Sequence, residues 1–156
     1  PSAASCVYRG VRVAGALSGR RSRGCSRTGR PRRTGWLDAC VVRYAGILSG
    51  IDYMAVTRLD ILDSFDAIKM CVGYKYNGEL LNEIPASMQI LADVEPVYET
   101  FEGWKTDITK VRTYEDLPEK AKKYLERMAE VTNIKLGIVP VGPNRDETIV
   151  IAKDIF

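Results

Sequence analysis

The charge distribution divides this chain into two parts and limits which of them can build a folded core. Residues 1–33 contain nine arginines, no lysine and no acidic residue, whereas residues 34–156 carry 14 basic and 20 acidic side chains. Residues 1–26 show no helical or strand period, and their Arg, Ser and Gly residues bury too little apolar surface to offset the entropy lost on ordering. We therefore expect most of residues 1–26 to be disordered or poorly packed.

The overall composition is typical of soluble globular proteins. The apolar fraction is 46% and the charged fraction is 28%, and 156 residues are enough for one modest domain. No apolar run approaches the ~20 residues that cross a bilayer, and the first residues lack the sustained apolar core of a signal peptide. These features predict a cytoplasmic protein that does not bind membranes.

The cysteines do not indicate a metal site. They lie at positions 6, 25, 40 and 71 without a CxxC spacing, and the chain has no histidine to complete a ligand set. Cys40 and Cys71 have apolar neighbours, so we expect them to be small core residues in a reducing compartment.

Two helices are predicted from helical periodicity. Thr34 is suited to cap a helix over residues 35–49, which Gly50 would end. Pro118 suits the first turn of a second helix over residues 117–131. The buried stripe expected for the first helix consists of Leu37, Val41, Tyr44 and Leu48. The buried face expected for the second consists of Leu117, Ala121, Tyr124, Leu125 and Met128.

Runs of β-forming residues predict the strands. They cover 53–57, 68–76, 97–100, 134–142 and 148–152. Asn77-Gly78 marks a tight hairpin turn after the second run. Strands that alternate with helices indicate an α/β fold, with a partly parallel sheet and flanking helices.

The segment 28–36, TGRPRRTGW, is a candidate loop for binding phosphate or carboxylate groups. Arginine pairs bidentately with such groups, and Gly29 and Pro31 form a loop whose backbone can approach a ligand closely. Thr34 and Gly35 open a predicted helix N-terminus, which also favours anions. The alternative is a solvated basic run beside a structured domain, and composition alone favours this alternative.

Two further segments could meet at one edge of the sheet. TRLD, residues 57–60, follows a predicted strand, at the edge where open α/β sheets bind ligands. The Asp60 carboxylate could accept hydrogen bonds from N1–H and the exocyclic amine of guanine, whereas adenine would leave it unpaired. The run 139–148 reaches the same edge if the two strands are neighbours. The alternatives are a helix-capping Asp60 and a plain turn at 142–143.

Six segments in this order closely resemble the carboxyl-terminal third of the adenylosuccinate synthetase family. They are TGRPRRTGWLD, TRLDILD, CVGYKYNGEL, EPVYETFEGW, LPEKAKKYLERMAE and VGPNRDETIV. The resemblance implies that residues 28–156 are the carboxyl-terminal portion of a larger, single-domain P-loop-type ligase. It leaves residues 1–27 as an Arg/Ser/Gly-rich segment outside that domain.

The resemblance also implies a reaction and a set of binding residues. The family joins IMP and L-aspartate into adenylosuccinate, with GTP as co-substrate and Mg²⁺ as cofactor. The residues implied in aspartate binding are Thr28, Gly29, Arg30, Pro31 and Arg32, with Arg30 also reaching IMP. The residues implied in GTP binding are Arg32, Arg58, Leu59, Asp60, Pro140, Val141 and Gly142.

The resemblance does not extend to the catalytic residues of the family. Its phosphate loop, Asp base, His acid and Mg²⁺ ligands lie in an amino-terminal region with no counterpart in this sequence. We therefore expect a fragment without ligase activity of its own, from a family that commonly forms homodimers. The competing hypothesis is a small anion- or RNA-binding protein that uses residues 1–27, but Tyr8 is the one aromatic residue there, which weakens nucleic-acid binding by stacking.

Overall fold

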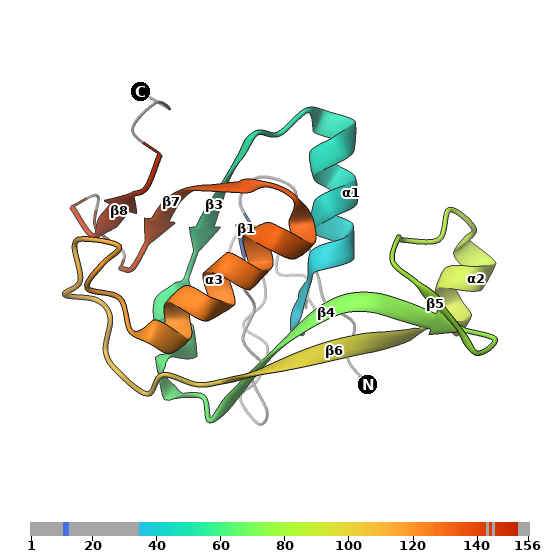
Figure 1. The fold of residues 1–156 in the computed structure, drawn as a ribbon, viewed down its shortest axis with the longest axis horizontal. Helices are drawn as coiled ribbons and strands as arrows, with labels where there is room; N and C mark the ends of the chain where they lie inside the picture. Colours follow the sequence, from blue (N-terminus) through green and yellow to red (C-terminus); the bar gives the residue numbers. More distant parts are fainter. Residues whose placement is uncertain (1–10, 13–34, 143, 145, 153–156) are drawn as a thin grey trace, which may run out of the picture.

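Two β-sheets organise the computed structural model, which describes residues 11–12, 35–142, 144 and 146–152 (Figure 1). The first sheet has the order β1-β3-β7-β8. Its strands are β1 (Val11–Arg12), β3 (Tyr53–Thr57), β7 (Lys135–Pro140) and β8 (Thr148–Val150). In the second sheet the long central strand β4 pairs with the three others. Its strands are β2 (Leu37–Asp38), β4 (Ala67–Tyr76), β5 (Glu79–Leu81) and β6 (Glu95–Glu102).

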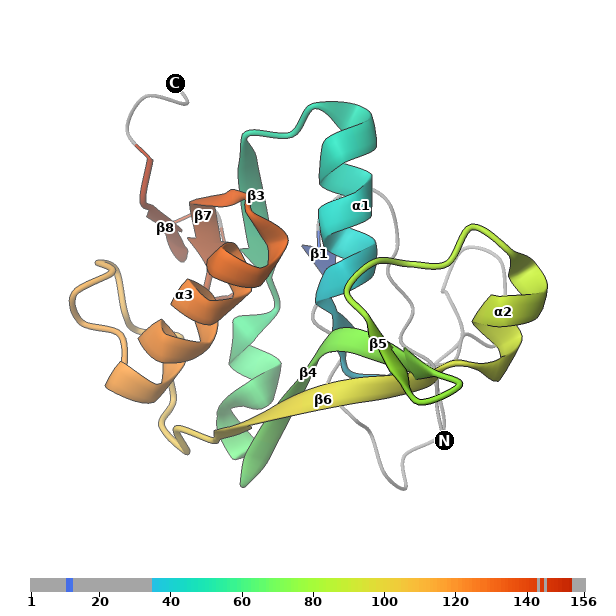
Figure 2. The ribbon, with the colours of Figure 1, turned by 45° about the vertical axis from the view of Figure 1, so that its right-hand side comes forward.

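The helices pack around these sheets. They are α1 (Ala39–Ser49), the 3-10 helix η1 (Leu59–Ser64), α2 (Met88–Asp93) and α3 (Glu119–Thr132). Helix α3 lies in front of the first sheet and contacts α1, β6 and β7, so it connects the two sheets (Figure 1). Helix α2 stands beyond β5, at the end of the second sheet that is farthest from α3 (Figure 2).

The sheets confirm a mixed α/β fold with partly parallel pairing. β3 runs parallel to β7, and β2 runs parallel to β4, whereas β5 and β6 are antiparallel to β4. The prediction of a single sheet was wrong. After β4 the chain turns back at the predicted Asn77-Gly78 turn, where both residues have positive φ, and β5 pairs with the end of β4. β6 then pairs with β4 over most of its length. This antiparallel pairing forms a second sheet that local periodicity could not distinguish from a continuation of the first.

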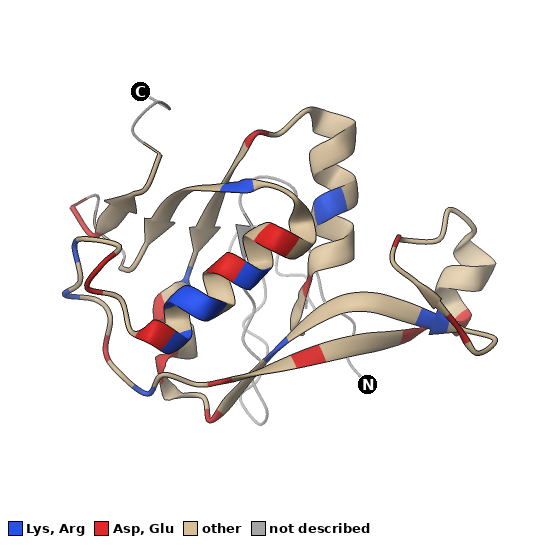
Figure 3. Cartoon of the chain, viewed as in Figure 1, with Lys and Arg blue, Asp and Glu red and all other residues tan. Residues whose placement is uncertain are grey.

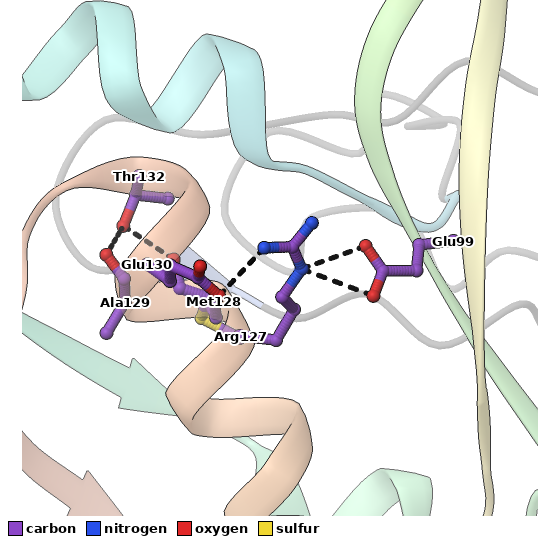
Figure 4. Close-up of polar contacts among 6 residues, drawn as sticks. All are labelled: Glu99, Arg127, Met128, Ala129, Glu130 and Thr132. Atoms are coloured by element: carbon purple, nitrogen blue, oxygen red, sulfur yellow. Dashed lines mark hydrogen bonds and ion pairs between the residues drawn. The ribbon is translucent and has the colours of Figure 1, made fainter.

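Helix α3 is confirmed with the face that the sequence predicts. Leu117, just before the helix, is 3% exposed, and the other four predicted residues are fully buried in the main core. Lys, Arg and Glu residues occupy many of its other positions (Figure 3). Arg127 extends from α3 and donates from Nε to the Glu99 carboxylate of β6 at 3.0 and 3.2 Å, and it also pairs with Glu130 at 2.7 Å (Figure 4). These groups are partly exposed, so we expect the pairs to orient α3 and to add at most about 1 kcal/mol to stability.

Helix α1 begins later than predicted and buries a different face. Its N-cap is Asp38, whose carboxylate accepts from Val41 N at 3.1 Å, while Thr34 lies outside the described residues. The preceding Leu37 and Asp38 form β2 beside β4, and this pairing sets the rotation of the helix. The buried residues are Ala39, Cys40, Val42 and Gly46. In the predicted stripe Tyr44 is 48% and Leu48 62% exposed, so that prediction was wrong for both residues.

Other local predictions have mixed outcomes. Gly50 ends α1 in the left-handed region with φ 59°, as predicted. The strands at 53–57 and 68–76 are confirmed as β3 and β4, and Cys40 and Cys71 are buried as expected. Helix α2 was missed because it is six residues long and buries no residue, which leaves no amphipathic pattern. Of residues 1–26, the structure describes Val11–Arg12 alone, as a short strand beside β3, so the expectation of disorder there stays a prediction.

Tyr124→Phe is expected to raise the free energy of unfolding by about 1 kcal/mol. The Tyr124 ring packs against Phe101 and Trp104, but its hydroxyl is buried and has no hydrogen-bond partner among the described residues. Phenylalanine keeps the packing and removes the unpaired group. Tyr74→Phe is the matched control, because the Tyr74 hydroxyl donates to Asp38 at 2.6 Å and its loss should lower stability. Urea unfolding of both variants measures the difference, and destabilisation by Tyr124→Phe would contradict the prediction.

Candidate functional site

The segment after β3 forms one half of the candidate site. Arg58 is exposed and adopts the left-handed conformation, with φ 67°, so the chain turns sharply as it leaves the sheet. Leu59 and Leu62 of η1 are fully buried and hold this turn against the core. Asp60 lies between these two anchors and is half-buried. The helix-capping alternative for Asp60 is not supported, because the residue lies inside η1 and Arg58 occupies the capping position.

The segment after β7 forms the other half. Val141 is fully buried, and its N–H donates to Glu147 O at 2.8 Å, which closes the connection between β7 and β8. The Glu147 carboxylate accepts from Asn144 N at 2.8 Å and lies against Gly142. The hydrogen bond from Asn144 lowers the pKa of Glu147, so the carboxylate is charged at neutral pH. Gly142 is half-buried beside this loop, and a side chain at this position would overlap the Glu147 carboxylate.

The two halves meet at one edge of the first sheet. β3 and β7 are parallel neighbours, with Tyr53 opposite Lys135 and Ala55 opposite Ile138. Their carboxyl ends therefore point the same way and deliver residues 58–60 and 141–142 to the same edge. The sequence predicts a shared edge for both segments if their strands are neighbours, and the pairing of β3 with β7 meets this condition. Ligands of open α/β sheets bind at such an edge.

The arginine-rich segment is outside the part of the chain that the structure describes. This applies to Thr28, Gly29, Arg30, Pro31 and Arg32, so their roles in binding stay predictions. The described chain begins again just after them, and the Trp36 ring packs edge-on against Phe65, with 5.8 Å between ring centroids. Phe65 directly follows η1. Trp36, which comes just after the arginine-rich segment, therefore contacts the residue next to the helix that carries Asp60. Sequence reasoning missed this contact because Trp36 and Phe65 belong to separate motifs.

A second unpredicted feature is the Asp63 carboxylate at the end of η1. It accepts from Trp104 Nε1 at 2.6 Å and from Ile108 N at 3.1 Å, and so holds the loop after β6 against η1. Burial raises the pKa of Asp63, and the two hydrogen bonds partly offset that effect. The spacing of 41 residues between Asp63 and Trp104 leaves no local signal in the sequence.

One hollow of the described structure lies away from this edge. It has a volume of about 260 Å³ and lies between the C-terminal ends of α1 and α3, beside Asp52 and Ile134. These residues immediately precede β3 and β7, so the hollow is at the opposite end of the same strands from Asp60 and Gly142. Its position does not coincide with the candidate site, and the candidate site rests on strand topology instead.

Comparisons with known proteins show the family of the chain. The family model for adenylosuccinate synthetase matches residues 14–149 of the chain. The chain belongs to the adenylosuccinate synthetase family. An adenylosuccinate synthetase of Brachyspira hyodysenteriae is 59% identical over 126 residues, and one of Desulforamulus reducens is 54% identical over 129 residues. These alignments cover 81% and 83% of this chain but 30% of each relative.

A solved structure supports the same family assignment. The fully ligated adenylosuccinate synthetase of Plasmodium falciparum superposes with a TM-score of 0.79 and 35% sequence identity. The superposition covers 92% of this chain and 37% of the Plasmodium chain. The chain therefore spans about a third of the length of the adenylosuccinate synthetases that it matches. The family model begins upstream of Thr28, and the predicted boundary between residues 27 and 28 stays a prediction.

Neither a cluster of metal ligands nor a membrane-spanning helix is present among the described residues. No group of three or more Cys, Asp and Glu residues there is placed to hold a metal ion. In the same part of the chain, no helix is long and apolar enough to cross a membrane.

Asp63→Ala is expected to lower the free energy of unfolding by about 2 kcal/mol, because two buried donors lose their acceptor. The donors belong to Trp104, which is 6% exposed, and to Ile108, which is fully buried. Urea unfolding followed by tryptophan fluorescence measures the loss. Asp107→Ala is the control, since Asp107 is exposed and bonds within its own turn to Thr109. Equal stability of the two variants would contradict the role assigned to Asp63.

Proposed function

We propose that this chain provides the guanine-binding edge and the aspartate-binding segment of an adenylosuccinate synthetase. The enzyme would ligate IMP and L-aspartate with GTP as co-substrate, in purine biosynthesis. The observation that supports the proposal is the parallel pairing of β3 with β7, which brings TRLD and the Val141-Gly142 segment to one edge. The membership of the chain in the family is the second support.

The Asp60 carboxylate is suited to select guanine. Within the described part of the chain no hydrogen bond to this carboxylate is found, and the side chain is half-buried. It can therefore accept from the N1–H and the exocyclic amine of guanine, which form a donor pair at the spacing of two carboxylate oxygens. Adenine has an acceptor at N1 and would leave the acid unpaired, at a cost of about 1–3 kcal/mol. Arg58 and Leu59 would support this contact, and Pro140, Val141 and Gly142 would line the opposite side of the base.

Residues 28–32 would bind the negatively charged substrates. Arg30 would pair with the aspartate carboxylate and reach IMP, and Arg32 would face GTP, since guanidinium groups bind carboxylates and phosphates bidentately. The contact between Trp36 and Phe65 supports this assignment, because it links the end of the segment to the element that carries Asp60. Mg²⁺ would be bound by residues other than the described ones. The catalytic acid and base would also be residues other than these.

Nucleotide binding tests the proposal directly. GTP added to the 156-residue chain should protect the amides of 57–64 and 139–142 from hydrogen exchange, and ATP should protect them less. Protection by neither nucleotide, or equal protection by both, would contradict the guanine site. The competing RNA-binding function predicts instead a salt-dependent affinity for RNA that is lost when residues 1–27 are deleted.

The 156-residue chain by itself is expected to have no ligase activity. Its described residues contain no histidine and no metal site, and it spans about 30% of the relatives named above. Incubation with GTP, IMP, aspartate and Mg²⁺ should therefore give no adenylosuccinate above background. The absorbance of the product measures this. The full-length Brachyspira relative serves as the positive control. Turnover by the isolated chain would show that the prediction is wrong.

A further inference from the structure

Two buried cysteines lie together where α1 meets the second sheet. Cys40 is in the first turn of α1 and is 2% exposed, and Cys71 is in β4 and is 1% exposed. Asp38, two residues before Cys40, is the register partner of Cys71 across β2 and β4. Cys40 and Cys71 share a small buried cluster with Tyr74. Strand pairing thus fixes the backbone of Cys71 and of Asp38, two residues before Cys40.

We propose that Cys40 and Cys71 form a site of oxidative modification, at which a small-molecule disulfide such as oxidised glutathione produces an intrachain disulfide bond. Two conditions limit such a bond: the side chains must point at each other, and the sulfur atoms must reach about 2 Å. Both residues belong to one small cluster of the reduced protein, so rotation of their side chains would bring the sulfur atoms to this separation. No shift of β2 against β4 is required.

The exchange proceeds in two balanced steps. The Cys40 thiolate attacks one sulfur of the small disulfide, forms a mixed disulfide and releases one small thiolate, which takes up a proton. The Cys71 sulfur then attacks the Cys40 sulfur, loses its own proton and releases the second small thiol. Two protein thiols and one small disulfide become one protein disulfide and two small thiols, with two electrons transferred to the reagent.

The order of attack follows from the surroundings of the pair. Interaction with the Cys71 thiol lowers the pKa of Cys40, although burial and Asp38 oppose this effect. The same interaction, together with burial, raises the pKa of Cys71, and the Cys71 thiol donates its proton to Gly73 O at 3.2 Å. Cys40 is therefore the residue that attacks first, since the thiolate is the nucleophile.

A small reagent can reach Cys40 and Cys71 because the side chains packed over them form a shallow layer. The cluster has three buried residues, and the residues packed over it are only partly buried. They are Leu81, Ile84, Val94 and Tyr98, which come from β5, β6 and the connection between them. Elements with such shallow packing open locally more often than the main core. The disulfide would link the first turn of α1 to β4, next to the chain that leaves the arginine-rich segment.

The test uses the full chain with Cys6→Ser and Cys25→Ser, so that the proposed pair supplies the two remaining thiols. Oxidised glutathione should remove both thiols without leaving a glutathione adduct. Trypsin should then release one linked species that joins residues 34–43 to residues 70–75, with two hydrogens fewer than the separate peptides. The midpoint of thermal unfolding should rise on oxidation and return to its starting value with dithiothreitol.

The outcomes separate the proposal from the behaviour of ordinary buried thiols. Free thiols at both positions after treatment, a stable glutathione adduct, or linkage that occurs only in urea would each overturn it. Cys40→Ser in the same background is the control, and it should show neither the linked peptide nor the thermal shift. Because the linked peptide is sought in a protein that retains both cysteines, the test does not depend on whether the control folds.

Discussion

Asp60→Asn is expected to weaken GTP binding by about 10- to 100-fold and to create affinity for xanthosine triphosphate. The carboxylate at position 60 can accept from both guanine donors, whereas an asparagine amide offers one acceptor and one donor. The amide nitrogen would then face the exocyclic amine of guanine, donor against donor. Xanthine carries a carbonyl at that position, so it would accept from the asparagine and restore two hydrogen bonds.

Competition against a fluorescent guanine nucleotide measures this change in selectivity. Asp93→Asn is the matched control, because Asp93 is an exposed residue at the end of α2, away from the sheet edge. It should leave the affinities for GTP and xanthosine triphosphate unchanged. If Asp60→Asn behaves like Asp93→Asn, Asp60 does not bind the base, and the guanine-binding edge is wrong even if the family assignment holds.

Gly103→Ala is expected to lower the free energy of unfolding by about 3 kcal/mol or more. Gly103 follows β6 and is buried against the backbone that leaves η1. A Cβ at this position would overlap the carbonyl oxygen of Phe65, which belongs to the backbone and cannot rotate away. The Gly103 N–H also donates to Asp66 O at 2.9 Å, so the two chain segments cannot separate without losing this hydrogen bond.

Urea unfolding compares this variant with Gly50→Ala. Gly50 has open space around its Cα but needs a positive φ, so alanine there should cost only about 1 kcal/mol. Gly103→Ala should also weaken GTP protection of 57–64, because it displaces the chain next to Phe65. A loss of stability no greater than that of Gly50→Ala would show that the contact between Gly103 and Phe65 is not a tight one.

Local sequence signals were sufficient where one element depends mainly on its own residues. The apolar face of α3, the left-handed Gly50 and the Asn77-Gly78 turn were all predicted, because helical period and permitted φ values are properties of short stretches. The segments 57–60 and 139–142 were assigned to strand ends for the same reason. The sequence placed the two segments at one edge only if their strands were neighbours, and the pairing of β3 with β7 meets this condition.

Local sequence signals failed where a residue contacts a partner that is far away in the chain. The start of α1 depends on Asp38, which accepts from Tyr74 of β4 as well as from Val41. The sequence placed the cap at Thr34 because nothing local shows that β2 pairs with β4. The contacts between Asp63 and Trp104 and between Trp36 and Phe65 went unpredicted for the same reason.

The sequence by itself determined the strands β3 and β7 and the helix α3, since these follow from residue types at short spacings. Six segments of the sequence also carried the resemblance to the adenylosuccinate synthetase family, which the family model then confirmed. Only the tertiary structure decided which face of α1 is buried, that the strands form two sheets, and that Cys40 meets Cys71. Each of these depends on pairing between distant segments, and the free energy that selects one pairing over another is shared by the whole core rather than carried by any short stretch.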